Sequence, residues 1–231
     1  MPRRLREATG GMVFHVLNRA VGRSTIFENE QDYRAFERTL WEAIEFQRMR
    51  VLSYCIMPNH WHLVLRPWHD GDLSRFMRWL TVTHTQRFHA AHHTAGTGPV
   101  YQGRFKSFPV ETDEHLFVVC RYVERNPVRA HLVRRAQNWH WGSLWHRVKG
   151  KPDIRKRLDC WPDRVPDDWT RWVNSPLSEK DLESVRVSVS RGRPFGSSLW
   201  QKRVARRLGL DSTLRDRGRP RKQKETKRGH S

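Results

Sequence analysis

Two histidines separated by a single residue are the first candidates for chemistry in this 231-residue sequence. His60 and His62 begin a stretch in which polar and apolar residues alternate, as in a strand, so both imidazoles point to the same face. Imidazole is a common ligand of divalent metal ions, so the pair could hold one ion or bind a phosphate. Two histidines on a solvated strand face are the alternative, and the spacing alone leaves both interpretations open.

A tyrosine and an asparagine four residues apart form a second candidate pair. Tyr122 and Asn126 lie in a segment with apolar residues at helical spacing, just before Pro127. Side chains at positions i and i+4 of a helix are neighbours, so both can point at the same spot. A phenol becomes a useful nucleophile once it is deprotonated. The alternative is a buried-edge tyrosine beside an asparagine that caps a helix.

Composition indicates the kind of partner. The chain has 44 Lys and Arg against 24 Asp and Glu, a net charge of +20 and a pI of about 11.1. Such an excess favours a polyanion, and the interleaving of Arg with aromatic residues suits stacking on unpaired bases. Three scattered cysteines, without a Cys-x-x-Cys pair, argue against a disulfide framework and a structural zinc cluster. No apolar run is long enough for a membrane span, so we expect a reducing, cytoplasmic location.

The elements that must position these side chains follow the order strand, helix, strand, strand, helix, strand. We expect the following segments: strands at 12–18, 51–57, 60–66 and 103–110, and helices at 32–48, 72–92 and 113–126. Pro58-Asn59 is turn chemistry that joins the second and third strands in a hairpin. Pro109 suggests that the fourth strand lies at an edge. This order predicts an α+β, ferredoxin-like or RRM-like split β-α-β sheet with helices on one face.

The rest of the chain divides by composition. We expect a catalytic domain over 1–150, closed by a short helix at 139–148, and a connecting segment over 151–177 without clear periodicity. A small helical extension over 178–210, possible as a helix-turn-helix, contains two short helices around a turn at 191–194. Residues 211–231 form a basic tail with almost no apolar residue, which predicts disorder.

Three motifs together resemble a known family. His60-Trp61-His62, the segment Tyr101–Ser107 and the segment Arg121–Ala130 are closely similar to the HUH single-tyrosine transposases, and most of all to the REP-associated tyrosine transposases of bacteria. The resemblance runs from about residue 13 to about residue 145. It implies an HUH endonuclease type of fold and a bacterial cytoplasmic protein associated with the nucleoid.

The resemblance also implies a reaction and a set of roles. Family members cut single-stranded DNA with a tyrosine and leave a 5′-phosphotyrosine bond, which a 3′-hydroxyl can reverse to give strand transfer. Tyr122 would be the nucleophile, with His60, His62 and Asn126 as metal ligands. The family often has Gln at the third ligand position, and Asn126 is one methylene shorter. We expect Mg²⁺ or Mn²⁺, with imidazole favouring Mn²⁺, and hairpin-forming REP repeats as substrate for a monomer or homodimer.

Further basic residues are candidates for DNA contacts. Phosphate contacts are expected from Arg19, Arg23, Arg104 and Lys106. Two Arg-Gly-Arg-Pro units, containing Arg193 in the first and Arg217 and Arg219 in the second, could lie in an A·T minor groove, although the first also suits a simple turn. His15, on the first strand, is expected to be a satisfied structural histidine.

Two other functions compete with this interpretation. One is a domesticated hairpin-binding protein that no longer cuts DNA, and the other is an RRM-like RNA-binding module that reads bases from its sheet face. The intact histidine pair and Tyr122 favour the enzyme.

Overall fold

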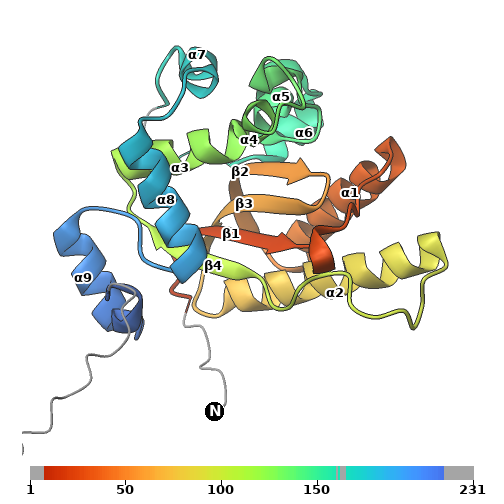
Figure 1. The fold of residues 1–231 in the computed structure, drawn as a ribbon, viewed down its shortest axis with the longest axis horizontal. Coiled ribbons are helices and arrows are strands. Elements are labelled where there is room, and N and C mark those ends of the chain that lie inside the picture. The colour runs from red at the N-terminus through yellow and green to blue at the C-terminus, as the bar shows by residue number, and fades with distance from the viewer. Residues whose placement is uncertain (1–7, 160, 162–164, 216–231) are drawn as a thin grey trace, which may run out of the picture.

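Four antiparallel strands form one sheet in the order β2-β3-β1-β4 in the computed structural model, which describes residues 8–159, 161 and 165–215 (Figure 1). The strands are β1 (Val13–Arg19), β2 (Met49–Met57), β3 (His60–Pro67) and β4 (Lys106–Val110). Helix α1 (Glu30–Phe46) connects β1 to β2, and α2 (Asp72–His92) connects β3 to β4. The predicted α+β class and the split β-α-β arrangement are confirmed.

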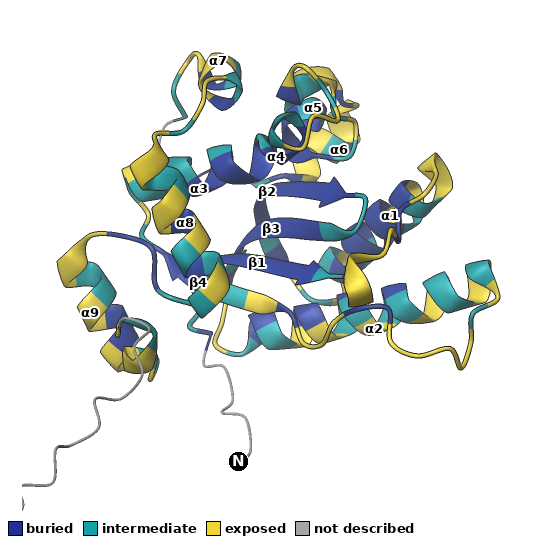
Figure 2. Ribbon diagram, viewed as in Figure 1, coloured by how far each residue is buried: buried dark blue, intermediate teal, exposed yellow. Residues whose placement is uncertain are grey.

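Both faces of the sheet are covered, so the strands form a buried middle layer (Figure 2). On one face, Phe14, Trp61 and Leu63 pack against α1 and α2. On the other face, apolar side chains such as Val64 and Phe108 pack against α3 (Glu114–Glu124). The expectation of helices on one face therefore describes the two connecting helices, while α3 and the helices after it use the opposite face.

A capping box explains where α1 begins. The Asn29 side chain accepts hydrogen bonds from the backbone of Gln31 and Asp32, and Asp32 accepts one from the Asn29 backbone. This capping box starts α1 at Glu30, two residues before the predicted start.

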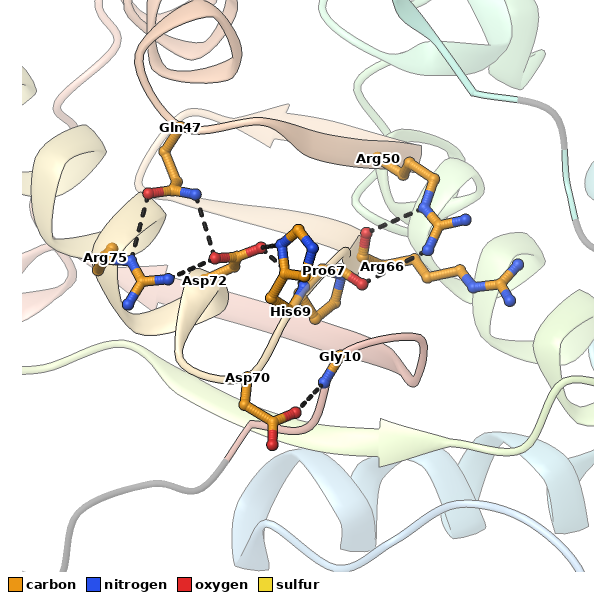
Figure 3. Close-up of polar contacts among 9 residues, drawn as sticks. All are labelled: Gly10, Gln47, Arg50, Arg66, Pro67, His69, Asp70, Asp72 and Arg75. Carbon is orange, nitrogen blue, oxygen red and sulfur yellow. Dashed lines mark hydrogen bonds and ion pairs between the residues drawn. The ribbon is translucent and has the colours of Figure 1, made fainter.

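At α2 the buried carboxylate of Asp72 accepts from the His69 backbone at 2.8 Å and from Arg75 at 2.6 Å (Figure 3). Gln47, at the end of α1, also donates to Asp72 at 3.2 Å. The first turn of α2 is thereby tied to the end of α1.

Residues 101–105 of the Tyr101–Ser107 motif form a loop before β4 instead of the beginning of the strand. Tyr101 Oη accepts a hydrogen bond from Trp61 Nε1 at 3.0 Å and lies 2.7 Å from His84 Nδ1. The Tyr101 hydroxyl forms no other side-chain hydrogen bond among the described residues, so its own proton goes to His84. Residues 101–105 are therefore held against β3 and α2, and β4 begins at Lys106, three residues later than predicted.

The second half of the chain contains more helix than its pattern indicates. Its remaining helices are α4 (Asn126–Arg129), α5 (Ser143–Lys149), α6 (Pro152–Arg157), α7 (Trp169–Asn174), α8 (Glu179–Arg191) and α9 (Ser198–Arg207), with 3-10 turns at Ala136–Asn138 and Asp211–Thr213. A further 3-10 turn, Val21–Arg23, follows β1. Two of the helices, α6 and α7, lie in the predicted connecting segment. Each has only six residues, too few to display a helical period, yet α7 buries Trp169 and Val173 against α3. The division into domains stays a prediction.

The C-terminal extension covers the outer edge of β4. The Phe195 backbone donates to the Pro109 carbonyl at 2.9 Å and accepts from the Glu111 backbone at 2.9 Å. Pro109 thus lies in an edge strand, as predicted. Gly192 ends α8 with φ +71°, so the first Arg-Gly-Arg-Pro unit is a helix cap followed by an edge pairing. No described helix has both the length and the apolar character needed to cross a membrane.

Candidate active site

The register of the sheet places the basic side chains of β1 and β3 together. Arg19 pairs with His60, and Leu17 pairs with His62, so these residues share the face beneath α3. The rings of His60 and His62 are 5.0 Å apart between centres and stand at 80° to each other. The predicted shared face of the two histidines is therefore observed.

Helix α3 carries the tyrosine to the same place. The Tyr122 ring centre lies 5.8 Å from that of His62 and 6.3 Å from that of His15. Its side chain is buried, with 6% exposed. A nucleophile candidate on α3 and two imidazoles, one on β3 and one on β1, are thus brought together although they are far apart in sequence.

Hydrogen bonds determine which nitrogen of His60 carries a proton. Asn59 Nδ2 donates to the backbone carbonyl of Arg23 at 3.0 Å. A carbonyl oxygen can only accept a hydrogen bond, so the atom of the Asn59 amide that faces it must be the nitrogen. The Asn59 amide oxygen therefore faces His60 Nδ1, which is 2.6 Å away and must donate its proton. His60 Nε2 is left with its lone pair, as metal binding requires.

His62 has a histidine as its partner. His62 Nδ1 lies 2.9 Å from His15 Nε2, and both rings are buried. The other nitrogen of His15, Nδ1, is buried without a hydrogen-bond partner in the described structure. His15 therefore differs from the satisfied structural histidine that the sequence suggests, since it touches the site through one nitrogen and lacks a partner at the other.

Burial keeps these imidazoles neutral. It lowers the pKa of His15 to about 3. Burial also lowers the pKa of His60 to about 3, with the cationic Arg19 and Arg129 contributing. The pKa of His62 is likewise well below its ordinary value, first through burial. At neutral pH the two rings of the predicted metal site are in the form that can coordinate a metal ion.

Both ends of the Asn126 amide form hydrogen bonds within the protein. Its Nδ2 donates to the carbonyl groups of Tyr122 at 3.1 Å and Val123 at 3.3 Å. Its Oδ1 accepts from Arg129 Nη2 at 2.5 Å. The side chain thus caps the end of α3, and the cationic guanidinium of Arg129 at its oxygen opposes the approach of a metal ion. Its role as a third ligand stays a prediction.

A buried carboxylate holds α3 in place. Glu124 is 3% exposed and accepts hydrogen bonds from Ser53 of β2, Ser143 of α5 and Trp169 of α7. Burial raises the pKa of this carboxyl, although its hydrogen bonds act in the opposite direction. Glu124 therefore joins four elements two residues after Tyr122.

The predicted phosphate contacts lie in different places. Arg19 is half-buried at the site, where it interacts electrostatically with Tyr122. Arg23 is exposed in the turn after β1, and Lys106 is exposed at the start of β4. Arg104 lines an open groove of about 620 Å³ between α2 and the loop that precedes β4. Arg193 donates to Gln201 within the C-terminal extension. Arg217 and Arg219 lie outside the described residues.

Two residues of the site were not identified from the sequence, although one lies directly before a motif and the other inside one. Asn59 directly precedes His60 in the hairpin turn. Arg129 follows Asn126 by three residues, a helical spacing that places the two side chains together. The residue type alone does not distinguish either one from the other asparagines and arginines of the chain.

A second group of potential metal ligands lies between β4 and α3. The ligand atoms of Glu111, Asp113 and His115 are within 4.8 Å of one another. Each has a structural partner, since Asp113 accepts from His115 and Glu111 accepts from the Ser197 backbone. These bonds give the group a structural role: Asp113 caps the start of α3, and Glu111 binds the backbone of the C-terminal extension.

Comparison with known proteins adds an independent finding. The family model described as "Transposase IS200 like" matches residues 8–126. No curated protein shows significant similarity to the chain. A solved REP-associated tyrosine transposase bound to a REP hairpin is 18% identical, with a TM-score of 0.53, and the match covers 77% of this chain and 95% of the other. At that identity the likeness concerns the fold. A proposed transposase from Deinococcus radiodurans R1 is 14% identical over 57% of this chain and 92% of the other, with a TM-score of 0.36.

Proposed function

The chain belongs to the IS200-like transposase family, and we propose that it cuts and rejoins single-stranded DNA by transesterification at Tyr122. The observation that carries the proposal is the placement of the Tyr122 ring 5.8 Å from His62, on the face that also bears His60. A nucleophile and neutral imidazole ligands within one small site are what phosphoryl transfer by a tyrosine requires.

The reaction exchanges one phosphodiester for another. Tyr122 Oη attacks the scissile phosphorus, its proton passes to solvent, and a bond forms between phosphorus and the phenolic oxygen. The bond from phosphorus to the 3′-oxygen breaks, and that oxygen takes up a proton to become a free 3′-hydroxyl. Because the phosphotyrosine bond retains the energy of the original linkage, attack by another 3′-hydroxyl reverses the step and transfers the strand.

A divalent ion fits the two histidines. His60 offers Nε2 because its Nδ1–H donates to the Asn59 amide oxygen, and His62 offers Nε2 once its Nδ1 donates to His15. Bound there, Mg²⁺ or Mn²⁺ would neutralise charge on the scissile phosphate and orient it, and the imidazoles favour Mn²⁺. Asn126 is the third ligand that we propose, after Arg129 releases its oxygen.

A hairpin-forming strand is the substrate that we propose. The solved relative of similar fold is bound to a REP hairpin, and the net charge of +20 on this chain suits a polyanion. Exposed Arg23, Arg104 and Lys106 surround the end of β1 that carries Arg19. They are the phosphate contacts that we propose outside the site itself.

The fold argues against an RRM-like function. An RRM stacks unpaired bases on aromatic residues of an open sheet face. Here α3 covers that face, and Val64 and Phe108 on it are fully buried. The binding-only alternative differs from our proposal in turnover alone, and the experiment must therefore detect a covalent bond.

The test is a denaturing-gel assay with hairpin-forming REP oligonucleotides labelled at the 5′ or the 3′ end. With Mn²⁺ or Mg²⁺ we expect a covalent protein–DNA band that carries the 3′-side label and is absent with EDTA. Tyr122→Phe should abolish the band while hairpin binding on native gels remains. A hairpin complex without any covalent band, whichever metal is supplied, would favour the binding-only protein.

A further inference from the structure

Three arginines at the end of α3 and in α4 point to two different places. Arg121 and Arg125 donate to backbone carbonyl groups at the C-terminal end of α7 and just after it. Arg129 turns the other way, and its guanidinium carbon lies 4.2 Å from the centre of the Tyr122 ring. Only Arg129 of the three is therefore placed to act at the site.

The guanidinium of Arg129 keeps donors available. A guanidinium has five N–H groups, and Arg129 donates one hydrogen bond, from Nη2 to Asn126 Oδ1 at 2.5 Å. Within the described part of the chain it forms no ion pair. A half-buried cation without a carboxylate partner, lying against a candidate nucleophile, is an anion-binding arrangement.

The second charge near the phenol is also positive. Arg19, whose strand position pairs with His60, interacts electrostatically with Tyr122 from the β1 side. A phosphorus atom at attack distance lies about 3–3.5 Å from the phenolic oxygen. Its free oxygens would then lie within reach of the Arg129 guanidinium, which already contacts the Tyr122 ring.

We propose that Arg129 is a catalytic residue that binds the scissile phosphate and stabilises the negative charge shared between the phosphate and the attacking Tyr122 oxygen. This inference rests on the proposed transesterification. As Arg129 turns from Asn126 to the phosphate, the Asn126 oxygen becomes free to coordinate a metal ion. Substrate entry and completion of the metal site are thus coupled through one side chain.

The experiment measures single-turnover formation of the covalent adduct with the REP hairpin oligonucleotide of the assay above. Arg129→Gln should slow the reaction by about 100-fold or more, as removal of one transition-state donor does elsewhere. Arg129→Lys should recover part of the rate because it keeps the charge. Arg125→Gln is the matched control, and it should lower the melting temperature while the rate of the folded protein stays near that of wild type.

A substrate with a neutral methylphosphonate at the scissile position separates catalysis from folding. This group lacks the anionic oxygen, so Arg129→Gln and the wild type should react with it at rates within a few-fold. Mn²⁺ affinity without DNA, measured by electron paramagnetic resonance, should not fall in Arg129→Gln, because the bond that occupies Asn126 is gone.

An Arg129→Gln protein that cuts the normal strand at the wild-type rate would overturn the inference alone. Equal losses on both substrates, or weaker Mn²⁺ binding, would likewise assign Arg129 a structural role. In these cases an adduct in the wild type that is lost in Tyr122→Phe would still support the proposed function. If the wild type forms no adduct, both fail together.

Discussion

His15 Nε2 lies 2.9 Å from His62 Nδ1, so the imidazole nearest to Tyr122 is oriented by another imidazole. For His62 to offer Nε2 to a metal ion, its Nδ1 must carry the proton and donate to His15. The remaining proton of His15 is then on Nδ1, which has no partner among the described residues. The metal-bound form therefore includes an unpaired buried N–H group, which costs free energy.

His15→Phe should lower Mn²⁺ affinity by about 10- to 100-fold, because it removes the acceptor for His62 and keeps an aromatic ring against Phe108. Isothermal titration calorimetry with Mn²⁺ measures this change directly. His15→Gln keeps an acceptor and should recover part of the affinity. An unchanged Mn²⁺ affinity in a folded His15→Phe protein would contradict the orienting role.

Asn59 makes two bonds that two substitutions can separate. Asn59→Asp keeps the acceptor for His60 Nδ1 but loses the donation to the Arg23 carbonyl, so Mn²⁺ affinity should be retained. Asn59→Ala loses both bonds and should weaken Mn²⁺ binding by about 10-fold or more. The two affinities, measured side by side, check the assignment, and equal losses in both variants would show that the turn matters only for folding.

Glu124 should make stability fall as the solution becomes less acidic. Its folded-state pKa is raised, so the folded protein holds this proton more tightly than the unfolded chain does. The contribution of Glu124 to the free energy of unfolding is therefore favourable below its pKa in the unfolded chain, and it is lost as the pH rises through its pKa in the folded protein. Glu124→Gln should remove that slope, since its oxygen can accept from Trp169 and its amide can donate to the hydroxyls of Ser53 and Ser143.

Urea unfolding between pH 4 and pH 8 measures the contribution of Glu124. Glu124→Ala should cost about 1–3 kcal/mol throughout, because it leaves the buried Trp169 N–H without an acceptor. A Glu124→Gln protein whose pH slope matches that of wild type would place the titration elsewhere.

His84 affects the pH dependence of stability in the opposite direction. Burial lowers its pKa to about 3, so between pH 6.5 and 3 the unfolded chain binds a proton that the folded protein does not. The contribution of His84 to stability is present above pH 6.5 and is lost as pH falls through this range. Its protonation would also remove the acceptor of the Tyr101 hydroxyl.

His84→Gln should reduce the loss of stability between pH 6.5 and pH 4.5 relative to wild type, as measured by urea unfolding at each pH. Gln keeps an acceptor for Tyr101 and does not titrate. The comparison with wild type cancels the other buried histidines, which the variant retains. Parallel curves for the two proteins would contradict the assignment.

Much of the fold could be predicted because its patterns are local. The alternation at His60 and His62 and the turn at Pro58-Asn59 depend on neighbouring residues, and the structure agrees with both. Helix α3 ends at Glu124, close to the predicted end at Asn126, although Pro127 does not stop helical structure, because α4 begins at Asn126.

The contacts that decide the chemistry could not be predicted, because distant segments supply them. The proton on His60 depends on a carbonyl at Arg23, 36 residues from Asn59. Arg125 and Arg129 are chemically identical, and their different destinations depend on where α7 packs. Helix α7 has only six residues, too few to show a helical period in the sequence. Burial of Trp169 holds it in place.

The two-residue hairpin between β2 and β3 makes the site intolerant of changes in chain length at that point. A shift of one residue in the pairing would turn Trp61 toward Tyr122 and send both histidines into the apolar layer against α1 and α2. The exposed stretch 95–99, which follows α2, faces no such constraint. Insertions in related chains should therefore accumulate after α2, while the hairpin keeps its length even where its residues change.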